Sequence, residues 1–229
     1  MNVIGKKWLF ISISAILVLL STLSIFLYGF KLGIDFTGGT LWQIKLDSQV
    51  SREDLSKFFE ETLKIDSVSI VPETSNGSFI IRLPELSEAD HQKNLQLISK
   101  EFGASEELLF ESIGASIGGE LRNKAITAFI FVLVGISLYI AFAFRKVSRP
   151  ISSWKYGIIT LLTLFHDAII PAGIFSYLGY KFGIEVDTNF IVAILVVMGF
   201  SVHDTIVVFD RIRENLRRIG GKAMDFNML

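Results

Sequence analysis

The sequence has no cysteine, only four prolines and only three histidines among its 229 residues. Without cysteine the chain can form neither a disulfide bond nor a thiolate metal site. Charge is also scarce, at 20% of residues, whereas apolar residues make up 51% and include 20 phenylalanines. That balance is unusual for a soluble globular protein, so the composition indicates a membrane protein.

Four long segments are nearly free of charge, and each is about as long as the ~20 apolar residues that cross a bilayer. They are Trp8–Phe30, Ile126–Phe144, Trp154–Tyr180 and Asn189–Val208. The first is longer than the apolar core of a signal peptide, roughly 7–15 residues, and no small-x-small cleavage site follows it. The sequence therefore predicts an α-helical polytopic membrane protein with four spans, the first of them uncleaved.

Lysine and arginine gather in the short segments before the first span, between the second and third, and after the fourth. By the positive-inside rule, both termini of the chain are expected in the cytoplasm. The long segment after the first span then lies on the other side of the membrane. The expected organisation is an N-terminus and first span (1–30), an extracytoplasmic domain (31–124), spans two to four (125–209) and a basic cytoplasmic helix and tail (210–229).

The segment 31–124 contains ten basic and sixteen acidic residues, a net charge of −6. This acidity argues against nucleic acid as its partner. β-rich runs at 40–46, 67–71, 79–83 and 107–113 are separated by two amphipathic helical patterns, 51–64 and 87–102. The order β-α-β-β-α-β predicts a small α+β domain of the ferredoxin-like type.

The fourth apolar run contains only two ionisable residues, His203 and Asp204. A charged carboxylate in the middle of a bilayer costs about 2.5–3.5 kcal/mol, so such residues usually face a bundle interior or a water path. An acid that releases a proton to one side and regains it from the other is the minimum part of a proton-driven machine. Each proton that crosses yields about 2.3 kcal/mol per 100 mV. The alternative is that Asp204 only accepts a hydrogen bond between helices.

The third apolar run contains a similar pair, His166 and Asp167, followed by Pro171. Proline has no N–H for the carbonyl of residue 167, so we expect a kink beside the acid. Thr160, Thr163 and Asp167 share one helical face and would form a polar path. In the alternative interpretation, the threonine hydroxyls bond their own i−4 carbonyls and Asp167 caps something local.

Two histidines and two aspartates could in principle bind a transition metal. Their spacing matches no known site, however, and adjacent helical residues diverge by about 100°, so His and Asp of one span do not easily face one ion. We expect no metal and no other cofactor. No nucleophile–base pair is evident, so an enzyme is not expected. The third histidine, His91, is expected on a polar surface helix without a role.

A glycine-rich segment follows the first span, and a basic segment follows the fourth. GIDFTGGT, with Gly33, Asp35, Gly38 and Gly39, lacks the strand–loop–helix context of a phosphate loop. It is expected to be a flexible joint between the first span and the first strand.

RIRENLRR follows the fourth span, just after Asp210, and begins with Arg211 and Arg213. It is either a basic amphipathic helix at the cytoplasmic interface or ordinary positive-inside charge.

Three of these motifs, in this order, resemble the SecF family: GIDFTGGT, FHD followed by a proline, and SVHDTIVVFDRIREN. SecF is a subunit of the bacterial SecDF complex in the resistance-nodulation-division superfamily. The resemblance implies a multi-pass protein of the bacterial cytoplasmic (inner) membrane that uses the proton-motive force to promote preprotein export. It implies a SecD-like subunit, the Sec translocon channel, preprotein clients and the lipid bilayer as partners, and no nucleic acid.

The resemblance also implies that Asp204 lies on a proton path, with His203, Asp167 and His166 as further candidates. The family has six spans and an arginine near this aspartate, so the chain is expected to be truncated at its C-terminus. Two other functions stay open. One is a subunit or fragment of a small-molecule exporter of the same superfamily, although such pumps have far larger external domains. The other is a membrane-anchored interaction module that transports nothing.

Overall fold

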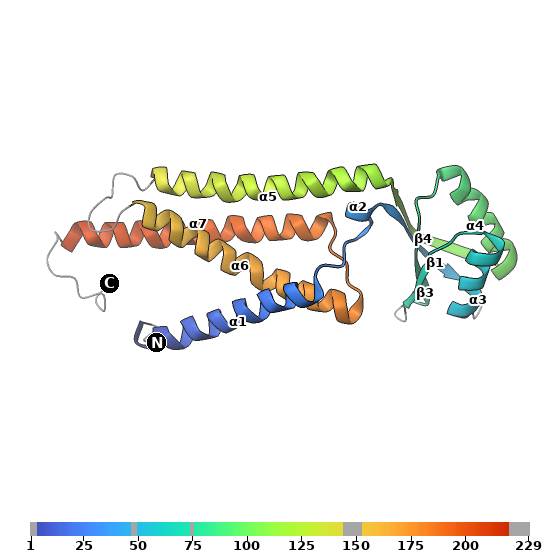
Figure 1. The fold of residues 1–229 in the computed structure, drawn as a ribbon, viewed down its shortest axis with the longest axis horizontal. Coiled ribbons are helices and arrows are strands. Elements are labelled where there is room, and N and C mark those ends of the chain that lie inside the picture. Colours follow the sequence, from blue (N-terminus) through green and yellow to red (C-terminus); the bar gives the residue numbers. More distant parts are fainter. Residues whose placement is uncertain (1–3, 47–49, 74–75, 144–152, 220–229) are drawn as a thin grey trace. The chain divides into compact units, whose positions relative to one another are not determined.

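The computed structural model describes residues 4–46, 50–73, 76–143 and 153–219 (Figure 1). It divides into two compact units. The membrane unit consists of Met1–Lys31 and Ala125–Leu229, and the α+β unit consists of Leu32–Lys124. Each is described by itself.

Within the described residues, four helices are long and apolar enough to cross a membrane, as the sequence predicted. They are α1 (Lys7–Tyr28), preceded by the short η1 (Ile4–Lys6), α5 (Ala115–Ala143), α6 (Ser153–Phe182) and α7 (Thr188–Ile219). α5 begins at Ala115, before the apolar run that starts at Ile126 and inside the segment assigned to the external domain, whereas the compact membrane unit resumes at Ala125. No proline interrupts this first part, and a Glu120–Lys124 ion pair of 2.7 Å at i,i+4 spacing supports it.

α6 is the central helix of the membrane unit, because its first half packs on α7 and its second half on α1 (Figure 1). The buried residues of the first half recur every four positions, which places them on one helical face. The same spacing recurs on α7. The resulting core contains Tyr156, Leu164 and Ala168 of α6, Ile194, Met198, Val202 and Phe209 of α7, and Ile140 of α5.

Small residues bring α1 and the second half of α6 into close contact. Ser24 Oγ donates to the carbonyl of Gly173 at 2.9 Å, and Ser176 Oγ donates to the carbonyls of Ser24 at 3.1 Å and Gly29 at 2.6 Å. Interhelical hydrogen bonds and small residues replace the hydrophobic effect between helices in a bilayer. α6 stays helical through Pro171.

The α+β unit contains one four-stranded antiparallel sheet in the order β2-β3-β1-β4. The elements follow the predicted β-α-β-β-α-β order, which confirms the ferredoxin-like prediction. They are β1 (Gly39–Leu46), α3 (Arg52–Lys57), η2 (Phe58–Thr62), β2 (Ser69–Glu73), β3 (Ser78–Leu83), α4 (Glu88–Phe102) and β4 (Ser105–Ile113). Ser51 and Ser87 cap α3 and α4, each accepting from the backbone N–H three residues on.

The core of the α+β unit lies between the sheet and its helices. On β1, Trp42 and Ile44 are buried while their neighbours are more exposed, the alternation of a strand with one covered face. The ring of Trp42 contacts Phe59 of η2 and Phe110 of β4 edge to face. The predicted helix 51–64 begins as expected but widens into a π-helix at Phe58, where Leu63 N–H bonds the Phe58 carbonyl.

Candidate functional site

Asp204 lies on the face of α7 that points away from the α6–α7 core. Met198 and Val202 are buried in that core. Asp204 follows Val202 by two positions, which rotates it by about 200° around the helix. Its side chain is 86% exposed, and the ring nitrogen Nδ1 of His203, itself 76% exposed, lies 3.7 Å from its carboxylate. Of the two surroundings expected for this acid, a bundle interior or a water path, the described α6–α7 core does not provide the first.

The pair on α6 is more enclosed. His166 Nδ1 lies 2.7 Å from Asp167 Oδ1, and the two side chains are 35% and 31% exposed. The expectation that adjacent His and Asp side chains diverge is wrong for this pair, because both side chains are long enough to turn back toward each other across the 100° between their Cα–Cβ bonds. Asp167 adjoins Ala168, which is buried against α7, and precedes Pro171 by four residues.

The described contacts do not join the α6 pair to the α7 pair. The polar stripe on α6 is locally satisfied, because Thr160 Oγ1 donates to the Tyr156 carbonyl and Thr163 Oγ1 to the Ile159 carbonyl, each at 2.9 Å. This is the arrangement that the alternative interpretation predicted. Within the described ranges, no three His, Cys, Asp or Glu side chains are close enough to hold a metal ion.

The glycine-rich segment is a tightly packed turn rather than a loose joint. Gly33 caps the four-residue helix α2 (Ile34–Thr37), with Asp35 in its first turn. Gly38 has φ +73°, and a Cβ there would meet the Ala115 Cα of α5 at 2.6 Å. Gly39 has φ +116° and passes close to the Leu83 carbonyl. Glycine is needed at both positions, because other residues rarely adopt these angles and Gly38 has no room for a side chain.

The basic segment after the fourth span is a continuation of α7 and not a separate interfacial helix. Arg211 is exposed and lies 3.1 Å from Glu214, one turn on. Asp210 precedes it on the same helix. The side chain of Arg213 and residues 220–229 lie outside the described part of the structure. Residues 211–218 are therefore helical as predicted, but they belong to α7 and do not form a helix of their own.

Sequence reasoning missed His91, which is 3% exposed and not on the surface. Its ring stacks on Phe110, with 3.6 Å between centroids. Its Nε2 bonds the Glu107 carboxylate, which also accepts from Trp42 Nε1 at 2.8 Å. The spacing could have indicated that His91 is buried, because it lies three and seven residues before the buried Asn94 and Ile98 and so shares their helical face.

One acid beside this cluster has a shifted pKa. Glu88 Oε1 accepts a hydrogen bond from Gln92 Nε2 at 2.8 Å and lies 3.4 Å from His91 Nδ1. The bond from Gln92, followed by that from His91, lowers the pKa of Glu88 below its ordinary 4.5. Bonds that favour the charged form act in this direction.

Comparison with known families shows which family the chain belongs to. The family of the SecD/SecF protein export membrane protein, C-terminal part, matches residues 94–228, more than half of the chain. The SecD/SecF GG motif matches residues 23–50, which include Gly38 and Gly39. The chain belongs to the SecD/SecF family.

SecF relatives match over nearly the whole chain. Protein translocase subunit SecF of Thermobaculum terrenum is 41% identical over 96% of this chain and 72% of its own length. The SecF of Sebaldella termitidis is 36% identical over 91% of this chain and 65% of its own length. The chain thus spans roughly two thirds to three quarters of these relatives.

A solved structure of the family has the same fold. The crystal structure of SecDF from Thermus thermophilus, a translocon-associated membrane protein, superposes with a TM-score of 0.78 at 31% identity. The match covers 99% of this chain and 29% of that one. The matched region of that structure therefore contains counterparts of both the α+β unit and the four membrane helices.

Proposed function

We propose that this chain is an accessory subunit of the Sec protein translocase that couples proton transfer at Asp204 to the export of preproteins. Its SecF relatives are named protein translocase subunits, and its fold matches SecDF. The proposal places it in the bacterial inner membrane as a multi-pass protein, with both termini in the cytoplasm and the α+β unit outside.

The observation that carries the proposal is the position of Asp204 on an uncovered face of α7. A charged carboxylate against lipid costs about 2.5–3.5 kcal/mol. The four described helices provide no cover for it, since its side chain is 86% exposed. The acid therefore needs another protein surface inside the membrane, and a proton that enters or leaves at that interface changes how the two surfaces attract each other.

We assign this uncovered face to contact with a SecD-like subunit. The Thermus thermophilus relative carries a region 35% identical to this chain as 27% of a longer SecDF polypeptide. In such a fusion, SecD-like and SecF-like parts belong to one polypeptide. By analogy, we place Asp204 and His203 at a SecD–SecF interface, while the more enclosed Asp167 and His166 form a second titratable pair on α6.

The test uses the full-length protein with its SecD partner, reconstituted with the translocase in vesicles that carry an imposed proton gradient. Asp204→Asn keeps the shape of the side chain but cannot ionise, so we expect it to abolish the gradient-dependent part of export. Asp204→Glu keeps an ionisable acid and should retain a measurable part. Gradient-independent export should be equal in both variants.

Other outcomes select other functions. If Asp204→Asn exports preprotein as the parent does, the chain is an anchored interaction module and the coupling proposal fails. If the variant leaves export intact but cells lose resistance to small toxic compounds, the chain belongs to a small-molecule exporter.

A further inference from the structure

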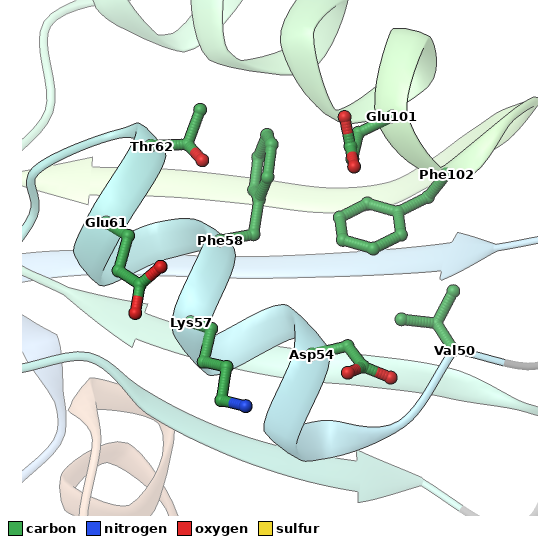
Figure 2. A pocket seen from close by; sticks show the side chains of 8 residues that line it. All are labelled: Val50, Asp54, Lys57, Phe58, Glu61, Thr62, Glu101 and Phe102. Carbon is green, nitrogen blue, oxygen red and sulfur yellow. The ribbon is translucent and has the colours of Figure 1, made fainter.

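The α+β unit has a cavity of about 520 Å³ on its helical side, between α3–η2 and α4. Figure 2 shows the rings of Phe58 and Phe102 next to each other there, with Glu101 on the α4 side and Asp54, Lys57 and Glu61 on the α3–η2 side. We call it the α3–α4 cavity. Its volume falls within the ~300–1,000 Å³ range of sites that hold small ligands or single side chains.

The π-helix builds the floor of this cavity. A wider helical turn reduces the angle between consecutive side chains, so Phe58 and Phe59 are both buried, 7% and 0% exposed. Phe59 points to Trp42 in the core, whereas Phe58 packs edge to face against Phe102, with 5.1 Å between centroids. π-turns inside helices occur frequently at functional sites. The result is an aromatic surface that reaches solvent between two helices.

The rim of the cavity is acidic. It has three carboxylates and one ammonium group, Lys57, a formal charge of −2. Asp54 is already engaged, since Ser51 Oγ donates to it at 2.7 Å as part of the α3 cap. Glu61 and Glu101 make no hydrogen bond or ion pair with any described residue. They are therefore available to a cation, and the net charge of −6 on residues 31–124 favours its approach.

We propose that the α3–α4 cavity binds a lysine or arginine side chain of an extended polypeptide segment, which, given the proposed function, belongs to a preprotein client. A lysine or arginine has an apolar stem and a charged end. The stem packs on Phe58 and Phe102, and the charged end lies at the acidic rim, where Glu61 and Glu101 lower the potential and the rings also attract it. An acidic or purely aliphatic segment lacks this match.

The geometry also sets the strength of binding. The carboxylates are exposed, so each contact is screened and contributes little. Binding is therefore weak and weakens further as salt rises, because the Debye length falls from about 10 Å at 0.1 M to about 3 Å at 1 M. Weak binding suits a client that has to be released as it moves outward.

The binding experiment uses the whole chain in lipid nanodiscs and a fluorescent twelve-residue peptide of alanine, leucine and serine with two lysines. Peptides with glutamine or glutamate in place of lysine are the matched probes. Glu61→Gln with Glu101→Gln should raise the Kd of the lysine peptide by about tenfold, in line with two exposed ion pairs. Glu53→Gln with Glu106→Gln removes the same charge from exposed positions outside the cavity and should leave the Kd within twofold. Equal loss in both double variants, or equal binding of the glutamine peptide, overturns the proposal.

A crosslinking experiment connects the cavity to export. Because the chain has no cysteine, Thr62→Cys at the cavity wall provides a single attachment point for a photoreactive group. A preprotein arrested during export should crosslink from this position, and less so when its lysines are replaced by glutamine. Asp204→Asn should abolish gradient-driven export but leave the peptide Kd unchanged, which keeps the two proposals separable. If no client crosslinks from Thr62→Cys while the position labels fully, the client assignment is wrong.

Discussion

The contact between α1 and α6 predicts that a single methyl group at Gly173 destabilises the membrane unit. A Cβ at Gly173 would lie 2.3 Å from the Ser21 Cβ and 2.4 Å from its Cα. Non-bonded carbons are attracted most at about 3.5–4.0 Å. The backbone of Ser21 cannot rotate away as a long side chain could, so in Gly173→Ala the two helices must move apart locally by about 1 Å.

Two costs follow from this separation. Over-packing of a filled interface typically costs about 1–3 kcal/mol. The movement also stretches the hydrogen bonds that join Ser24 to Gly173 and Ser176 to Ser24 and Gly29. Such bonds contribute about 0.6 kcal/mol each in membrane proteins. We therefore expect Gly173→Ala to lower the free energy of unfolding by about 3 kcal/mol.

The measurement is unfolding of the full chain in mild detergent against increasing dodecyl sulfate, followed by circular dichroism. Gly135→Ala in α5 and Gly199→Ala in α7 are matched controls, since a Cβ at either glycine meets no atom within 4 Å. Alanine is the better helix former by about 0.8–1.0 kcal/mol, so both controls should be neutral or slightly stabilising. If Gly173→Ala unfolds at the same denaturant fraction as these two, the close-contact argument is refuted.

Three further predictions concern the α+β unit. His91→Ala removes a buried stacked ring and takes one hydrogen-bond partner from the Glu107 carboxylate, so we expect the free energy of unfolding, followed by tryptophan fluorescence, to fall by about 2–4 kcal/mol; a change below 1 kcal/mol would contradict it. Gly38→Ala is destabilised both by the positive φ and by a collision with Ala115. Gly77→Ala, with φ +70° and open space, is destabilised only by the positive φ, so the free energy of unfolding should fall more for the variant at 38. Because the pKa of Glu88 is lowered by folding, its stabilising contribution is present above pH 4.5 and lost as pH falls through the lowered value. Gln92→Ala should move the carboxyl titration of Glu88, observed by NMR, back toward 4.5, and an unchanged titration would show that the hydrogen bond is not the cause.

Several elements could be predicted because their determinants are local. The four apolar runs became helices, and Ser51 and Ser87 cap α3 and α4 as their spacing with Asp54 and Asp90 suggests. The β-α-β-β-α-β order followed from alternating patterns and a turn at Asn76–Gly77. Boundaries were less predictable, because a helix can begin outside its apolar run, as α5 does at Ala115.

The candidate site was predicted only in part. The motifs around Asp204, Asp167 and Gly38 identified the family, and the family models match the same regions. The sequence did not show which face of α7 is buried, because the position of the buried stripe depends on which side chains of α6 pack against it. His91 was misjudged because its polar neighbours in the sequence do not show that Phe110 and Glu107 of strand β4 stack on and bond its ring.

The sequence by itself determined the four predicted spans, the order of strands and helices along the α+β unit and the acidity of the segment between the first two spans, since periodicity and composition act over one turn or one strand. Only the tertiary structure decided that Gly38 lies against α5, that Gly173 lies against Ser21 and that Phe58 and Phe102 form a cavity with an acidic rim. These features join residues far apart in the chain. They depend on close packing, in which each side chain occupies the space that other elements leave.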